Sequence, residues 1–71
     1  MTAPNIWLLT PRELEVLNLL PSGDTNKHIA RKLNIEEGTV KHHITNIIIK
    51  SGIDNRTRLA VEWTKLHLTP I

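Results

Sequence analysis

Apolar side chains recur along the chain at spacings of three and four residues, the period of a helix with one buried face. The first such segment carries Leu14, Val16, Leu17 and Leu20. It opens with Thr10-Pro11-Arg12-Glu13, which has the spacing of a capping box, and it stops at Pro21. The pattern therefore predicts a helix that has Thr10 as its N-cap and ends near residue 20.

Two further periodic segments follow, separated by a very short connection. The second helix is expected to open at Asp24 or Thr25 and to end near Leu33. Asn34-Ile35-Glu36 then leaves a three-residue turn, after which a third helix should run from about Glu37 to Lys50 or Ser51, where Gly52 ends it. Two helices joined so tightly must cross steeply. The pattern therefore predicts a helix-turn-helix with Ile35 filling the corner.

The last periodic segment predicts a fourth helix. Asp54 and Asn55 precede it, with Asn55 the preferred N-cap, and Leu59, Trp63 and Leu66 share one side as far as about Leu68. No segment alternates as a strand would. We therefore expect an all-α, four-helix domain containing a helix-turn-helix over residues 10–68. Residues 1–9 should form a leader that packs on the core, and residues 69–71 a short tail.

The predicted third helix has two different faces. A turn of about 100° per residue places Val40, Ile44, Ile47 and Ile48 on one apolar side. The opposite side carries Gly38, His42, Thr45 and Ile49, bordered by Lys41 and by His43, Asn46 and Lys50. No carboxylate occurs between Thr39 and Lys50, whereas a solvated face usually gains from Glu/Lys pairs four residues apart. The acid-free face suits the major groove of DNA, which admits one helix and offers base edges to Lys, Asn, Thr and His.

Three segments together resemble the LuxR/NarL-type (GerE-like) helix-turn-helix of bacterial transcription regulators: LTPRELEVL, NKHIARKLNIEEGTVKHHITNIIIKSGI and NRTRLAV. The resemblance covers residues 8 to about 62. It implies that the third helix enters the major groove while the second lies across the DNA backbone. Carried over by position, the base-contacting residues are Lys41, His42 and Thr45. The expected backbone contacts are Asn26, Lys27, Thr39, His43, Asn46, Lys50 and Arg56.

The same resemblance implies partners and a role. Such domains bind double-stranded DNA, usually as homodimers joined through the fourth helix, where Val61, Thr64 and Leu68 form a side available to a second subunit. RNA polymerase is a further candidate partner. The chain would then be the output domain of a response regulator or a small stand-alone regulator, located in the cytoplasm.

Four positions depart from the family's pattern. Glu36 stands where Ser or Thr is usual, so the third helix should have a carboxylate cap or none. His28 replaces a usual Glu and removes a capping-box partner for Thr25. Ser51 replaces a usual Leu, which should leave a less apolar helix end. Ile49 lies on the outer face, where polar or basic residues are common in the family. Its neighbour could be a thymine methyl group, a partner protein or solvent.

Composition narrows the function further. A formal net charge of +2 is too small to predict a polyanion partner by itself, so the placement of the charges decides. The chain has no cysteine, and the adjacent His42 and His43 point about 100° apart, so we expect no metal site. No apolar run approaches the roughly 20 residues of a membrane span. No catalytic arrangement or phosphate loop is present, so we expect neither an enzyme nor a cofactor or small-molecule ligand.

Two alternatives keep the same fold. A protein-interaction helix-turn-helix could dimerise with a larger regulator or inhibit it without binding DNA, and the modest charge and Ile49 are compatible with that role. A promoter-reading domain of a sigma factor shares the fold and the LTPRE-like opening.

Overall fold

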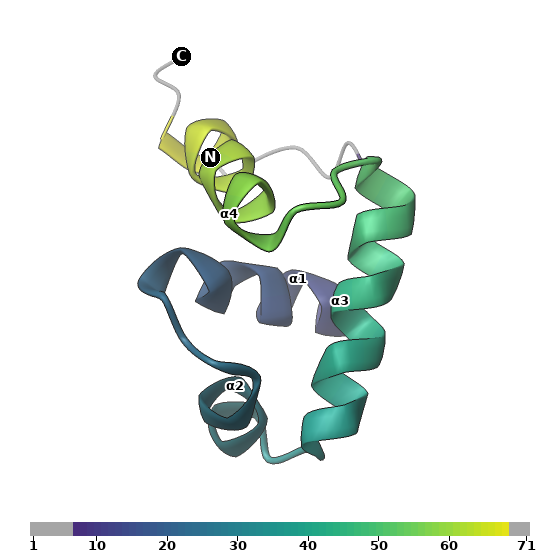
Figure 1. Cartoon of the computed structure of the whole chain (residues 1–71), viewed down its shortest axis with the longest axis vertical. Helices are drawn as coiled ribbons and strands as arrows, with labels where there is room; N and C mark the ends of the chain where they lie inside the picture. The colour runs from purple at the N-terminus through teal and green to yellow at the C-terminus, as the bar shows by residue number, and fades with distance from the viewer. Residues whose placement is uncertain (1–6, 69–71) are drawn as a thin grey trace.

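The computed structural model describes residues 7–68 and is helical over most of them. The elements are α1 (Pro11–Leu19), the short 3-10 helix η1 (Leu20–Ser22), α2 (Asn26–Leu33), α3 (Glu37–Ser51) and α4 (Arg56–Leu68). The long helix α3 runs along one side of the molecule (Figure 1). Helix α1 crosses its middle, α2 lies near its N-terminal end and α4 near its C-terminal end. No strand occurs between residues 7 and 68, which confirms the predicted all-α class.

The start of α1 is fixed by a complete capping box. The backbone N–H of Glu13 donates to the Thr10 hydroxyl at 3.2 Å, and the backbone N–H of Thr10 donates to the Glu13 carboxylate at 2.9 Å. Helix α1 ends at Leu19, which agrees with the predicted end near residue 20, and Pro21 lies in the first turn of η1, where a proline removes no hydrogen bond. The backbone then continues as the tighter helix η1, which ends at Gly23. Gly23 has a φ of 77°, a left-handed conformation that glycine adopts without strain.

The predicted helix-turn-helix is confirmed. Helix α2 starts after Thr25, whose hydroxyl accepts from the His28 N–H, so Thr25 rather than Asp24 is the cap. At its end Asn34 adopts a left-handed φ of 56°, and the Ile35 N–H donates back to the Ala30 carbonyl at 3.0 Å. This bond closes a Schellman-type turn. It directs the chain into α3 after three residues, with Ile35 half-buried at the corner.

The ends of α3 and α4 also agree with the sequence. Gly52, with a φ of 74°, ends α3, and its N–H donates to the Ile48 carbonyl. The Asn55 side chain accepts from the Arg58 N–H at 3.0 Å and so caps α4. Ser51 uses its hydroxyl to accept from the Ile53 N–H at 3.1 Å, so a polar bond replaces the apolar contact that a leucine would give at this end of α3.

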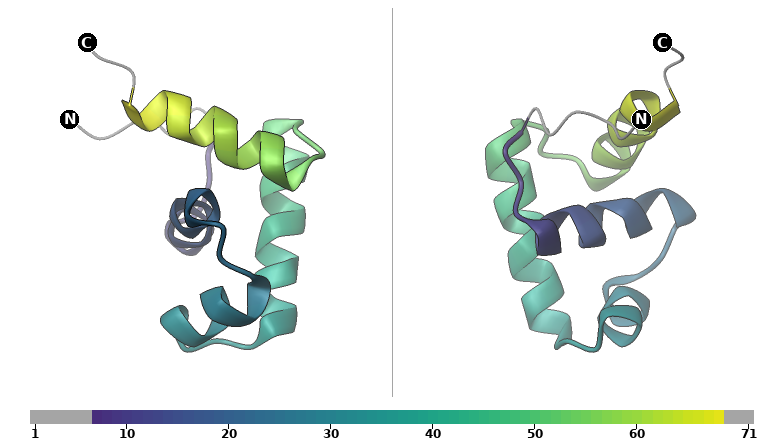
Figure 2. Two further views of the ribbon diagram at one scale, coloured as in Figure 1. Left: turned by 60° about the vertical axis from the view of Figure 1, so that its left-hand side comes forward. Right: turned by 180° about the vertical axis from the view of Figure 1, so that it is seen from behind.

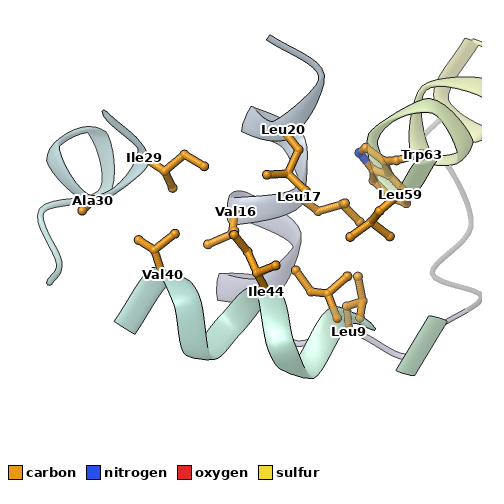
Figure 3. Close-up of a cluster of buried hydrophobic side chains, with 11 residues drawn as sticks. Leu9, Val16, Leu17, Leu20, Ile29, Ala30, Val40, Ile44, Leu59 and Trp63 are labelled. Carbon is orange, nitrogen blue, oxygen red and sulfur yellow. The ribbon is translucent and has the colours of Figure 1, made fainter. Parts of the chain in front are cut away.

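The core draws side chains from all four α-helices, with α1 at its centre (Figure 3). The buried apolar residues are Leu9, Val16, Leu17, Leu20, Ile29, Ala30, Val40, Ile44, Ile47, Leu59 and Trp63. Helix α1 packs against α3 and α4, while α2 packs against α3. The predicted apolar side of α3 is confirmed, although Ile48 is only half-buried.

Two tryptophans join the described end of the leader to α4. The rings of Trp7 and Trp63 lie 5.9 Å apart between centroids, and the Trp63 indole N–H donates to the Asn18 side chain at 2.8 Å. Leu9 is buried in the same hydrophobic cluster as Trp63. The predicted tail (residues 69–71) and residues 1–6 of the leader lie outside the described residues.

Candidate nucleic-acid interface

One side of α3 is left uncovered by the other described helices. Helices α1 and α2 lie on its inner side in each of three views, and α4 lies across its C-terminal end (Figures 1 and 2). We call the opposite side the outer face and define it by the exposed residues Gly38, Thr39, Lys41, His42, Thr45 and Ile49. It contains no acidic residue, although Glu36 and Glu37 are exposed at the start of the helix. The expected base-contacting residues, Lys41, His42 and Thr45, therefore lie together on an accessible surface.

The start of α3 has no side-chain cap. Glu36 occupies the N-cap position, but its carboxylate makes no capping hydrogen bond. Of the two expected outcomes, a carboxylate cap or no side-chain cap, the second is the one observed. A helix whose first N–H groups lack side-chain partners attracts an anion. Gly38 and Thr39 lie in this first turn and are both exposed. The arrangement is suited to a DNA phosphate at this end of the outer face.

Residues expected at the DNA backbone fall into accessible and partly enclosed groups. Lys27, on α2, and Thr39 are exposed, whereas His43 and Asn46 are half-buried along one border of the outer face. The rings of His42 and His43 diverge, with centroids 6.4 Å apart. Among the described residues no group of three or more His, Asp or Glu could hold a metal ion.

Arg56 is used inside the fold. Its guanidinium donates to the Asn26 side-chain oxygen and, at 2.6 Å, to the Asp24 carbonyl. Asp24 also pairs with Lys32 at 2.7 Å. Two residues expected at phosphates, Asn26 and Arg56, are therefore bonded to each other. Arg56 thus links the start of α4 to the start of α2, across a sequence separation of about 30 residues that no local pattern indicates.

Lys50 is likewise held within the fold. Its ammonium group lies 2.7 Å from the carboxylate of Glu13, a residue that is only 3% exposed. The same carboxylate oxygen accepts the Thr10 N–H of the capping box. The contact of Lys50 with a phosphate, which the sequence suggested, would have to compete with this ion pair. The two residues are 37 positions apart, so no local pattern could reveal the pairing.

The ion pair governs the titration of Glu13. Burial by itself raises the pKa of the Glu13 carboxyl, but the hydrogen bonds from Lys50 and Thr10 and the charge of Lys50 outweigh it, so the pKa lies below its ordinary value. A depressed folded-state pKa contributes stability above the unfolded-state pKa. That contribution is lost as the pH falls through the folded-state value.

Replacing Lys50 by Met should therefore destabilise the domain in a pH-dependent way. At pH 7 the buried carboxylate would lose its partner, and we expect unfolding free energy to fall by about 1–2 kcal/mol, less than for a fully buried pair because Lys50 is partly exposed. As the pH falls through the lowered folded-state pKa of Glu13, the carboxyl becomes protonated in both proteins, and the urea unfolding curves of the variant and the unmodified protein should converge.

A matched control uses Lys65, which pairs with Glu62 at 3.5 Å on the surface of α4. Lys65→Met should change the stability by less than about 0.5 kcal/mol at either pH. An equal loss for both lysine variants, or a Lys50→Met loss that persists at low pH, would contradict the role given to the Glu13–Lys50 pair.

A groove of about 690 Å³ lies between the η1–α2 connection and α4. Its apolar wall includes Leu20, Pro21, Ala60 and Val61, and Val61 is 47% exposed. Thr64 also lines the groove, so it collects two of the three residues expected at a dimer interface. The side chain of the third, Leu68, lies outside the described residues.

These features define a helix-turn-helix domain with an exposed third helix. A tight helix-turn-helix presents an acid-free, uncovered α3 and is supported by two further helices. The described helices include none long and apolar enough to cross a membrane.

The chain belongs to the luxR family of bacterial regulatory proteins, whose family model matches residues 8–63. It is 55% identical over 59 residues to the transcriptional regulatory protein LnrK of Bacillus subtilis, covering 82% of this chain and 27% of that protein. It is 45% identical to the nitrate/nitrite response regulator protein NarL of Escherichia coli, covering 84% and 28%. It is 44% identical to the spore germination protein GerE of Bacillus subtilis, covering 83% and 80%. The chain thus spans just over a quarter of most of these relatives.

Proposed function

We propose that the chain is the sequence-specific DNA-binding domain of a bacterial transcription regulator, with α3 in the major groove of double-stranded DNA. The outer face of α3 carries the proposal, because it is exposed, acid-free and uncovered by the other described helices. Membership of the luxR family supports the same role, and this family is one of DNA-binding regulators rather than a class of enzymes. The family match also favours a regulator over a sigma-factor domain.

The residues divide into two kinds of contact. Lys41, His42 and Thr45 are proposed to meet base edges, which set the preferred sequence. Phosphates, which set affinity and register, are proposed to meet the N-terminal turn of α3 and a group of side chains on α2 and α3. That group is Asn26, Lys27, Thr39, His43 and Asn46. Lys50 and Arg56 are assigned first to the fold, through Glu13 and through Asn26 and Asp24.

A homodimer is the proposed binding unit. The groove beside α4, with Val61 and Thr64, is the proposed seat of the second subunit, and Leu68 extends the same helix. A two-fold dimer would read two half-sites related by its symmetry. RNA polymerase contact and a cytoplasmic location are further proposals that follow from a regulator's role. LnrK is much longer than this chain, which is compatible with an output domain of a larger regulator. GerE is of similar length, which is compatible with a stand-alone regulator.

Selection of binding sites from random duplex, followed by a salt titration, tests the function. We expect one sequence to be enriched. The logarithm of its binding constant should fall linearly with the logarithm of salt concentration, at a slope near −0.9 per phosphate contacted. The competing role as a DNA-free interaction module predicts no enriched duplex and a salt-insensitive complex with another protein. That pair of results would overturn the proposal.

Gly38→Ala offers a test in which stability and binding should change in opposite directions. A Cβ at Gly38 would meet nothing within 4 Å, so alanine should raise unfolding free energy by about 0.5 kcal/mol through helix propensity. On the outer face, however, the added methyl group would hold the first turn away from DNA. We therefore expect a Tm a few degrees higher together with affinity for the selected duplex lower by about tenfold.

The readouts are thermal unfolding followed by circular dichroism and duplex titration at one salt concentration. Unchanged affinity for the Gly38→Ala protein would mean that the first turn of α3 does not approach the DNA closely. A lower Tm would contradict the open space found around this glycine.

A further inference from the structure

Ile49 is an apolar side chain at the C-terminal end of the proposed DNA-facing surface. It is 71% exposed and lies on the outer face of α3, four residues after Thr45. The other large apolar residues described as exposed are Leu8 and Val61, and Val61 lines the groove beside α4. A single exposed isoleucine is common and implies nothing by itself. Its neighbour one turn earlier gives the second observation.

The hydroxyl of Thr45 is turned back onto its own helix. Its O–H donates to the Lys41 carbonyl, with 3.0 Å between the two oxygens. A hydroxyl has one hydrogen, so in this state Thr45 offers a partner only an acceptor oxygen and a methyl group. It therefore cannot donate a hydrogen bond to guanine or to the thymine carbonyl. Ile49 can offer only apolar contact.

The major groove contains one apolar group that suits both side chains, the 5-methyl group of thymine. Against other base edges Ile49 would desolvate polar groups without giving them a hydrogen bond, which is unfavourable. Residues four apart on a helix are separated by a rise of about 6 Å, and stacked base pairs by about 3.4 Å. The two side chains would therefore meet bases about two steps apart.

We infer that Thr45 and Ile49 read thymine methyl groups, so that each half-site carries thymines under the C-terminal half of α3. This inference rests on the proposed function and states which base feature that same surface recognises. The N-terminal half of the outer face, with Lys41 and His42, retains the polar contacts. The outer face therefore makes polar contacts with bases at its N-terminal half and apolar contacts with bases at its C-terminal half.

Uracil substitution tests the inference in the selected duplex. Each thymine of the half-site is replaced in turn by deoxyuridine, which removes the methyl group and leaves the hydrogen-bonding edge intact. Because one buried methyl group is worth roughly a fourfold change in affinity, two positions should each weaken binding by about three- to tenfold. All other positions should be neutral.

Protein variants then assign each methyl group to its side chain. Thr45→Ser removes the threonine methyl group and keeps the hydroxyl, and Ile49→Ala removes most of the apolar contact. Each variant should abolish the uracil penalty at one position and leave the other intact. Leu8→Ala, at a residue that is 82% exposed and lies outside α3, is the matched control and should leave both penalties unchanged.

The outcomes separate this inference from the proposed function. Tight, salt-dependent binding to a selected duplex with no uracil penalty would overturn the thymine inference alone. Penalties that persist in both variants would overturn it too, because other side chains would then read the methyl groups. Failure to select any duplex would overturn both proposals.

Discussion

Thr45→Glu is expected to abolish specific DNA binding while leaving the domain folded. Thr45 is exposed, so folding free energy should change by less than about 0.5 kcal/mol. The new carboxylate would stand in the centre of the outer face, against the negative potential of the major groove. A like-charge contact of this kind costs several kcal/mol, and we expect affinity to fall by at least about 100-fold.

Ser22→Glu separates the position of the new charge from its effect on net charge. Ser22 is exposed on η1, away from α3, and the substitution lowers the net charge by the same amount. Fluorescence anisotropy with the selected duplex should show at most a few-fold change for Ser22→Glu. Comparable losses for the two variants would mean that the overall charge, rather than the outer face of α3, determines binding.

The largest loss of stability is expected for Leu17→Ala. Leu17 is fully buried in α1, the helix that packs against both α3 and α4. Truncating a buried leucine costs about 3–5 kcal/mol, and a domain of this size has a total unfolding free energy of only about 4–10 kcal/mol. We expect the Tm to drop by about 15–25 °C, and a substantial unfolded fraction at 37 °C.

Urea and thermal unfolding measure this effect, with Leu8→Ala as the exposed counterpart. The Leu8 variant should stay within about 0.5 kcal/mol of the unmodified protein. At low temperature the folded fraction of Leu17→Ala should still bind the selected duplex, because Leu17 is on the inner side. A loss below about 1 kcal/mol would contradict the central place given to α1 in the core.

Local signals explain why so much of the fold could be predicted. The capping box of Thr10 and Glu13, the turn at Asn34, and the cap at Asn55 each depend on residues within five positions of one another. Interactions between residues so close in the sequence can be predicted from the residue types and their spacing. The two faces of α3 were legible for the same reason, since helical periodicity assigns each residue to a side before the neighbouring elements are known.

Contacts between distant segments could not be predicted in the same way. Lys50 and Arg56 were expected at phosphates, Lys50 because of the family resemblance and Arg56 because it is a basic residue just inside the fourth helix. Packing instead brings Lys50 to the buried Glu13, and Arg56 to Asn26, across 37 and 30 residues of sequence. Whether a cation faces outward or is neutralised within the fold depends on which helices meet. The accessible position of Lys41, His42 and Thr45 was anticipated, while their individual contacts with bases remain predictions.

The bond between Arg56 and Asn26 has a consequence for how two subunits would cooperate on DNA. Both residues line the groove proposed for the second subunit, and Asn26 also stands at the start of the helix proposed to cross the phosphates. A second protomer bound in that groove would strengthen or weaken the hydrogen bond between Arg56 and Asn26. Self-association and operator affinity would then be thermodynamically linked, each strengthening or weakening the other by the same factor.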